Sequence, residues 1–398
     1  MTTPTITTAQ GGRPSVNPAT AHFTAPATGP AQCLHQVRTV PGITRSQLHD
    51  DRGMSQPTIT RHISTLIDAG LVQQGSPTAA GAVGRPGSTL HPDGRNLTAL
   101  GAHVGLRSTQ LVAVDGAGRP LRTRTLRLPI TELQPDEALE AIKHGLTSLG
   151  RDLPNPVGLG VAFSAHVDYA GRINAPEYGW ENVDPAAHLD AGIPVAVSTG
   201  VGAMAGSELA SSPLYLHADP RASTLYIYAR ELVGHAWIVG DSVHQPHTGS
   251  APSAFKEIAH SGPFPTTGHG HPLGTTSVLA TARQRGLPAT TITDLVALSE
   301  HNETARELLD ERARLLSRIV SLAVDVVDPT TVVFAGETFT ADAGTVRFIA
   351  DGLRGDGRQL SIQRAGDGIL SRAAAVTALH RLWQNPLGTL AGLPRSGR

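Results

Sequence analysis

Hydrophobic residues in the stretch Gly42–Leu71 recur at helical spacing. In its second half they follow i, i+4, i+7 and i+8, the spacing of one apolar helical face; they are Ile59, Ile63, Leu66 and Ile67. Ser55 stands where this helix needs an N-cap, and Gly70 stands where a left-handed C-cap would end it. The pattern predicts a helix between these two residues.

A shorter helix is expected just before it. Thr44 and Gln47 form the T-x-x-Q pattern of a capping box, and Leu48 supplies an inward side chain. This helix should stop near Gly53, because glycine turns at low conformational cost. On the second helix Arg61 falls opposite the apolar stripe, at about 100° per residue. The stretch is typical of a helix-turn-helix, and an ordinary helical hairpin is the alternative.

The residues that follow add a second feature of DNA-binding domains. Leu71–Gln74 reads as a strand and Ser88–Leu90 as its return, with a Gly-Arg-Pro-Gly turn at 84–87 between them. A small turn that carries one arginine fits the narrow minor groove, although it could also be a plain surface turn. Placed directly after a helix-turn-helix, this wing predicts a winged helix that binds double-stranded DNA.

The residue types of this winged helix suggest how it would contact DNA. Arg61 is expected at base edges and phosphates, together with three residues near the helix start, Gln56, Thr58 and Thr60. Arg45 is expected on the DNA backbone, and Arg85 in the flanking minor groove. Two copies, in a homodimer or homotetramer, would bind both half-sites of a near-palindromic operator.

The regions on either side differ in composition. Residues 1–30 are rich in Thr, Pro, Ala and Gly and are expected to form a disordered tail, because they bury too little apolar surface. Ala31–Val40 should be a first helix that places Cys33 in the core, so the winged-helix domain spans 31–95. Residues 384–398 are expected to be loose.

From Leu100 onward the pattern predicts an α/β body. Val157–Phe163 is almost continuously apolar, as in a strand of a sheet that is covered on both faces. The other expected strands are Ala102–Gly105, Gln110–Asp115, Leu121–Leu128, Ser223–Ala229, Ala236–Val239 and Thr330–Ala335. The expected helices are Pro135–Leu149, Ala305–Val327, Gly344–Gly352 and Ile369–Trp383. We divide this body into two lobes, 96–195 and 196–383.

Charge and cysteine content exclude several classes of protein. The 398 residues carry a net charge of −1, so the molecule as a whole is no polyanion binder. Its first 95 residues hold seven Arg against four Asp, so that part is basic and the rest acidic. The single cysteine excludes a disulfide framework and a Cys-rich zinc site. Without a signal pattern or a run of about 18 apolar residues, a cytoplasmic protein with no membrane contact is expected.

Several blocks together resemble the ROK family of repressors, open reading frames and sugar kinases. They are the GRPG wing, VGLGVAFSAHVDYAGRINAPEYGW at 157–180, KEIAH at 256–260 and DPTTVVFAGE at 328–337. The resemblance covers about Ala31 to Trp383 and is nearest to the repressor branch. It implies a winged helix-turn-helix followed by a two-lobed, actin-like ATPase fold of the sugar-kinase type.

The kinase motifs of that family are altered here. His103 replaces the Asp of the first phosphate turn, and Arg230-Glu231-Leu232 replaces the Gly-Thr-Gly of the second. Gly200 stands where the family has its catalytic Asp, and glycine cannot accept a proton from a sugar hydroxyl. The resemblance therefore implies a regulator without phosphotransfer activity, with no catalytic residues and no cofactor.

The family's sugar and zinc ligands are only partly present. Glu257 and His260 match the Glu and His of its sugar-binding block, and they could bind an effector or form a structural hydrogen-bonded pair. The zinc cysteines are missing, so we expect no metal, with His260, His269 and His271 as the weak candidates for ligands.

The sequence thus predicts a DNA-binding transcriptional regulator of the repressor type, whose body binds a sugar or other metabolite or serves for dimerisation. A sugar kinase with an appended DNA-binding domain is one alternative, and a ligand-independent dimerisation scaffold is another.

Overall fold

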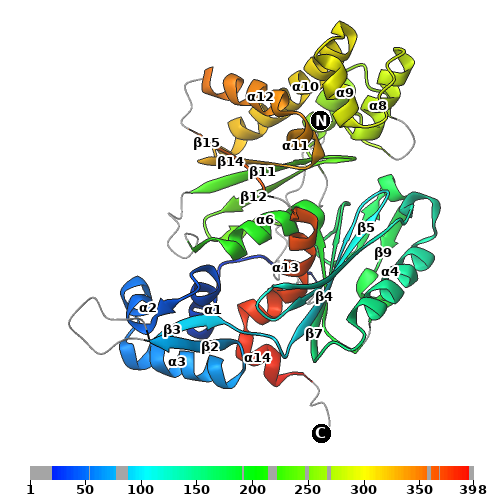
Figure 1. Ribbon diagram of the computed structural model, residues 1–398. Helices are drawn as coiled ribbons and strands as arrows, with labels where there is room; N and C mark the ends of the chain where they lie inside the picture. The colour runs from blue at the N-terminus through cyan, green and yellow to red at the C-terminus, as the bar shows by residue number, and fades with distance from the viewer. Residues whose placement is uncertain are drawn as a thin grey trace, which may run out of the picture.

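The structure is a computed structural model that describes residues 20–393, except 53, 78–87, 191, 214–221, 247–250, 267–269, 356–359 and 367. Figure 1 shows a small N-terminal head, in blue, beside a body of two lobes. Each lobe contains a five-stranded mixed sheet with helices on its faces. The α/β class expected from the sequence is confirmed.

The head is a winged helix. Its helices are α1 (Gly29–Thr39), α2 (Arg45–Arg52) and α3 (Gln56–Asp68). Its antiparallel sheet has the order β1-β3-β2 and consists of β1 (Ile43–Thr44), β2 (Val72–Pro77) and β3 (Ser88–Pro92). Of the predicted apolar stripe of α3, Ile59, Ile63 and Leu66 are fully buried in the core that contains Leu34 and Leu48, and Ile67 is partly buried against it. The sequence missed only β1, which has two residues and no pattern of its own.

Local hydrogen bonds fix the helix ends that the sequence predicted. The Thr44 amide donates to Gln47 Oε1 at 2.9 Å, and the Gln47 amide donates to Thr44 Oγ1 at 3.3 Å. The Thr58 amide donates to Ser55 Oγ at 3.4 Å, which caps α3. Gly70 has a φ of 70°, the left-handed conformation expected after α3. The turn residue Gly53 lies outside the described residues.

The sheet of the first lobe has the order β10-β7-β4-β5-β6. Its strands are β4 (Thr98–Val104), β5 (Thr109–Asp115), β6 (Pro120–Leu126), β7 (Pro156–Phe163) and β10 (Val195–Thr199). Helix α4 (Pro135–Gly150) covers one face and α13 (Ile369–Gln384) the other. Smaller elements complete this lobe: 3-10 turns at Ile130–Glu132 and Pro176–Tyr178, β8 (Ile173–Ala175), β9 (Trp180–Val183) and α5 (Pro185–His188).

The sheet of the second lobe has the order β13-β12-β11-β14-β15. Its strands are β11 (Ser223–Ala229), β12 (Val233–Val239), β13 (Ser242–Val243), β14 (Thr331–Ala335) and β15 (Ser361–Arg364). The helices on its outer face are α7 (Ser253–His260), α8 (Thr275–Gln284), α9 (Ile292–Ser299), α10 (Glu303–Val327), α11 (Glu337–Ala341) and α12 (Ala343–Gly355). Helix α6 (Gly200–Ser211) covers the inner face and packs against α13, so these two helices lie between the sheets (Figure 1).

Three expectations about the N-terminal segment, the C-terminal segment and the division into lobes were wrong. Residues 20–30 are not a free tail: Phe23 is buried and α1 begins at Gly29. Helix α14 (Pro386–Ala391) follows α13 and packs on it, so residues 386–391 are not loose. Helix α13 was assigned with the second lobe but packs on the sheet of the first, because its Ala-rich face fits strand glycines there. Residues 1–19 and 394–398 lie outside the described part.

Candidate nucleic-acid interface and interlobe cleft

Helix α3 presents a polar surface on the side away from the head's core. Ile59, Ile63 and Leu66 have no exposed surface, and four polar residues between them are exposed: Gln56, Thr60, Arg61 and Ser64. Thr58 is half-buried, and its hydroxyl lies 2.8 Å from Ser55 Oγ. Of the predicted residues of α3, Gln56, Thr60 and Arg61 are therefore accessible, and Thr58 is only partly so.

Of the other two arginines predicted to contact DNA, the structure describes Arg45 but not Arg85. Arg45 is the first residue of α2 and is half-buried; its Nε has no hydrogen-bond partner in the part of the chain that the structure describes. Arg85 and the whole Gly-Arg-Pro-Gly turn lie outside the described residues. The two strands that lead to this turn are paired, with Gln74 opposite Leu90.

The first kinase position, at the end of β4, is occupied by a buried histidine. His103 is 2% exposed, and its Nε2 has no partner among the described residues. A Cβ atom on Gly200 would lie 2.9 Å from this Nε2, so the imidazole takes the space that a side chain at 200 would need. Burial, and then the charge of Arg230, lowers the pKa of His103 to about 4. The ring is therefore neutral at pH 7.

An ion pair joins the two phosphate-loop positions across the lobes. Arg107, which follows β4, pairs with Glu231 at 2.6 Å, and Glu231 lies between β11 and β12. Thr276, on α8, lies 2.7 Å from both Arg107 Nη2 and Glu231 Oε2. We call these three residues the interlobe clamp. The sequence identified Glu231 as a misfit in a phosphate loop, but nothing in it indicated the partners, which lie 124 and 45 residues away.

The cleft around this clamp contains further charges. Its walls include His103, Arg107, Tyr228, Arg230 and Glu231. Arg230 Nε lies 3.9 Å from Glu337 Oε2, so the second arginine also faces a carboxylate of its own chain. Burial raises the pKa of Tyr228 to about 12 and keeps the phenol protonated. The positive charges of Arg107 and Arg230 are thus each compensated by a carboxylate of the same chain.

The candidate sugar and zinc residues lie on the second lobe. Glu257 and His260 are exposed and lie one turn apart on α7; His260 Nδ1 donates to the carbonyl of Lys256 at 2.7 Å. His271 Nδ1 accepts from the Leu273 amide at 3.1 Å, and burial lowers its pKa to about 4. His269 lies outside the described residues. Within the described ranges, no three metal-ligating side chains come together.

Comparisons with known proteins agree with this architecture. No family model matches the chain. It is 31% identical to a protein named a transcriptional regulator from Mycobacterium tuberculosis H37Rv, over 90% of this chain and 87% of that one. A protein of the same description from Mycobacterium bovis matches to the same extent. Across the described residues, no helix is long and apolar enough to span a bilayer.

Solved structures share the fold at low sequence identity. A ROK family transcriptional regulator, a homologue of the Escherichia coli MLC protein, superposes with a TM-score of 0.68 at 16% identity, over 91% of this chain and 98% of that one. A ROK glucokinase from Streptomyces griseus, in complex with glucose and AMPPNP, gives 0.55 at 18% identity over 70% of this chain and 99% of that one. Only the first of these two matches is long enough to include the head. With the winged head, the two-lobed body and relatives at 31% identity over most of both chains, the chain belongs to the ROK family of transcriptional regulators.

Proposed function

We propose that the head binds duplex DNA with α3 in the major groove. The observation that supports this most directly is that α3 exposes polar residues while it buries Ile59, Ile63 and Leu66 completely. Arg61 and Gln56 would contact base edges, and Thr58 and Thr60 would contact bases or phosphates near the helix start. Arg45 would hold the DNA backbone, and Arg85 would enter the minor groove.

We infer that the regulator acts as a homodimer or a homotetramer in the cytoplasm. Winged helices of two subunits would bind half-sites about 34–36 Å apart, or a multiple of that distance, on a near-palindromic operator. Binding at a promoter would repress transcription by blocking access to it.

Selection from a random duplex library with the full chain would identify the bound sequence. On the selected duplex, Arg61→Ala should weaken binding by about 1–3 kcal/mol per half-site and relax specificity there, because one base contact is lost. Arg283→Ala is a matched control, since Arg283 is exposed on α8, far from the head. The proposal fails if Arg61→Ala binds as wild type in a salt-controlled titration.

We further propose that the body has lost phosphotransfer. Three features support this: a neutral His103 at the first phosphate turn, its ring in the place of a side chain at 200, and Glu231 at the second turn. A carboxylate there repels phosphate, and glycine supplies no base. A coupled ADP-release assay with a panel of hexoses should give no turnover. Sugar-dependent ADP release would instead establish the alternative, a sugar kinase with a DNA-binding head.

Because carboxylates of the chain itself compensate Arg107 and Arg230, the two lobes can approach each other without a bound ligand. If a sugar or another metabolite does act as effector, Glu257 and His260 are its candidate contacts. A thermal-shift screen separates the two cases, because a ligand at about 100 times its Kd would stabilise the folded chain by about 2.7 kcal/mol. Stabilisation that is lost in Glu257→Gln would support an effector site on α7, and no stabilisation by any sugar would favour the dimerisation scaffold.

A further inference from the structure

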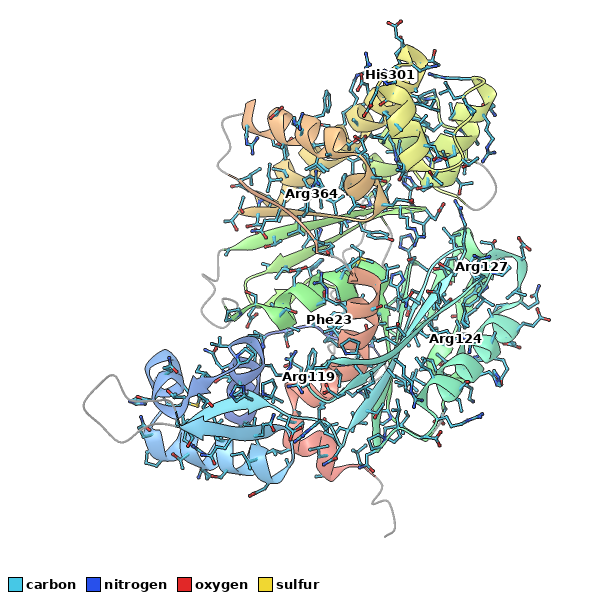
Figure 2. All side chains as sticks on the ribbon, viewed as in Figure 1. Phe23, Arg119, Arg124, Arg127, His301 and Arg364 are labelled. Atoms are coloured by element: carbon cyan, nitrogen blue, oxygen red, sulfur yellow. The ribbon has the colours of Figure 1, made fainter. Side chains whose placement is uncertain are left out.

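The described chain ahead of the head, Thr20–Thr28, runs along the body before it enters α1 at Gly29. We call it the strap. Figure 1 shows it crossing from the two lobes to the blue helices, and Figure 2 places Phe23 beside α13. The head is therefore attached to the body in two ways: covalently through the segment 93–97 that leads into β4, and non-covalently through the strap that precedes α1.

The strap adds to the edge of the first lobe's sheet. The Ala21 amide donates to the carbonyl of Val197 on β10 at 2.8 Å, and Thr20 forms a parallel bridge with the same residue. Thr20 Oγ1 also donates to the carbonyl of Tyr169 at 3.3 Å. β10 is the terminal strand of its sheet, so the strap covers an edge that would otherwise be open.

A few residues later the strap also adds to the edge of the second lobe's sheet. The Val243 amide donates to the carbonyl of Phe23 at 2.8 Å, and the Ala25 amide donates to the carbonyl of Asp241 at 2.6 Å. Thr24 forms an antiparallel bridge with Ser242 of β13, the terminal strand of that sheet. One extended segment is therefore hydrogen-bonded to both lobes.

A buried aromatic ring anchors the strap between these two edges. Phe23 is 6% exposed and meets the ring of His380, on α13, edge to face at 6.3 Å between centroids. Gly206 of α6 makes room for it, because a Cβ there would collide with the Phe23 ring. The anchor thus contacts both helices that lie between the lobes.

The far end of α1 rests on the body as well. The Arg38 guanidinium lies over the ring of Trp383, 3.2 Å from its centroid, and Trp383 Nε1 donates to the carbonyl of Gly116 at 3.0 Å. His35 Nε2 donates to the carbonyl of Ser212, which follows α6, at 3.0 Å. Helix α1 is therefore positioned by contacts at its start, through the strap, and along its length.

We propose that the strap is a positioning element that makes the place of the DNA-binding head depend on the arrangement of the two lobes. Any rotation of one lobe against the other displaces β10 relative to β13, and the strap is bonded to both strands. Because only residues 26–28 lie between the last of these bonds and the start of α1, that displacement moves the head. Its effect on DNA binding rests on the proposed function of the head, but the mechanical coupling does not.

A distance measurement tests the coupling without DNA. Spin labels would be placed on Ser46→Cys in the head and Arg347→Cys on α12, since both positions are exposed and the native Cys33 is buried. Phe23→Ala should broaden the head-to-lobe distance distribution, because it releases the strap's anchor. Thr24→Ala is the matched control, since the neighbouring Thr24 side chain is exposed and its backbone bridge remains.

A second perturbation distinguishes coupling from a local loss of packing. Glu231→Ala breaks the interlobe clamp at a site that does not touch the head, and it should shift the head-to-lobe distance when the strap is intact. In Phe23→Ala that shift should disappear. Ala25→Pro removes only the bond to Asp241 and should act in the same direction, which covers the case in which Phe23→Ala fails to fold.

The proposal is overturned if Glu231→Ala leaves the distance unchanged with an intact strap, or if its shift persists after the strap is released. Affinity for the selected duplex is a separate measurement. Phe23→Ala should weaken DNA binding several-fold, and Thr24→Ala should not. If no variant binds DNA, the proposed function of the head fails, and the distances still decide the role of the strap.

Discussion

At the scale of single residues, the nucleotide side of the cleft is altered by matched replacements. His103 is large and neutral where a small acid would hold a cation, and Gly200 is empty where a base would stand. The two fit each other: the imidazole of the first lies against the backbone of the second. Replacing one of these residues alone therefore cannot return the function of the other position. A side chain at position 200 should also lower the free energy of unfolding, because the imidazole occupies its space.

Gly200→Ala should lower the free energy of unfolding by about 1–3 kcal/mol, because its Cβ would meet the buried ring of His103. In a His103→Ala background most of that cost should vanish, leaving a coupling of about 0.5–3 kcal/mol in the double-mutant cycle. Urea denaturation of the four chains measures it. Additive effects would show that the two residues do not compete for the same space.

Buried histidines predict a loss of stability in acid. Burial, the largest cause in each, lowers the pKa of His103 and of His380 to about 4, below the ordinary value of 6.5. The unfolded chain therefore binds these protons first, and the stability present above pH 6.5 is lost as the pH falls towards 4. Each histidine contributes a slope of up to roughly 1.4 kcal/mol per pH unit in that window.

Urea midpoints between pH 7.5 and 4.5 measure that slope. His103→Gln should reduce it, because the proton that His103 binds only in the unfolded chain no longer contributes. His301→Gln is the control, since this side chain is exposed at the outer end of the second lobe (Figure 2). An acid slope that His103→Gln leaves unchanged would contradict a buried, neutral imidazole.

At the scale of elements, α13 and the strand glycines beneath it hold the first lobe together. A Cβ on Gly160 would collide with the backbone of Ala378, and one on Gly101 would lie 2.5 Å from the carbonyl oxygen of Ala374. Neither neighbour is a flexible side-chain end, so the helix itself would have to move. The close approach of helix and sheet depends on glycine at both strand positions.

Gly160→Ala should therefore destabilise the chain by at least about 1–3 kcal/mol, as overpacking does. Gly352→Ala is a matched control: it lies within α12, and the nearest atom to its Cβ is Ser317 Oγ at 3.6 Å. There the substitution should stabilise by about 0.5–1 kcal/mol, because alanine favours helix. Thermal unfolding of both variants measures the contrast, and equal shifts would count against the steric account.

Elements with a periodic pattern could be predicted from the sequence, and elements held by distant partners could not. The caps at Thr44 and Ser55 and the stripe on α3 are local signals, and the structure has them where expected. The strap has no periodic pattern of apolar residues, because it is held by backbone hydrogen bonds to strands more than 170 residues away. Its composition resembles a disordered tail, and the edges of both sheets together with the burial of Phe23 make it ordered.

At the scale of the whole molecule, two sets of contacts on separate surfaces, the clamp and the strap, join the lobes. The clamp links Arg107, Glu231 and Thr276 on the nucleotide side. The strap links β10 and β13 beside the head. The chain itself supplies both the cation and the anion of the clamp, so the two lobes attract each other across the cleft.

Breaking the clamp should open the cleft more than it destabilises the chain. The Arg107 side chain is 57% exposed and that of Glu231 is 14% exposed, so solvent screens part of the attraction. Arg107→Ala and Glu231→Ala should each lower the free energy of unfolding by only about 1 kcal/mol. Both should nevertheless raise the radius of gyration in solution scattering, because the hydrogen bonds between Arg107, Glu231 and Thr276 are lost with either partner.

The double variant should open the cleft no further than either single change, since one interaction has been removed in all three chains. Arg314→Ala is the control: it removes an ion pair with Glu311 of similar exposure, but within α10 and not between lobes. It should leave the radius of gyration at the wild-type value. If the clamp variants also keep that value, then other interlobe contacts must hold the lobes: the packing of α6 and α13, the strap, and the hydrogen bond from Tyr169 Oη to the carbonyl of Gln245 at 3.0 Å.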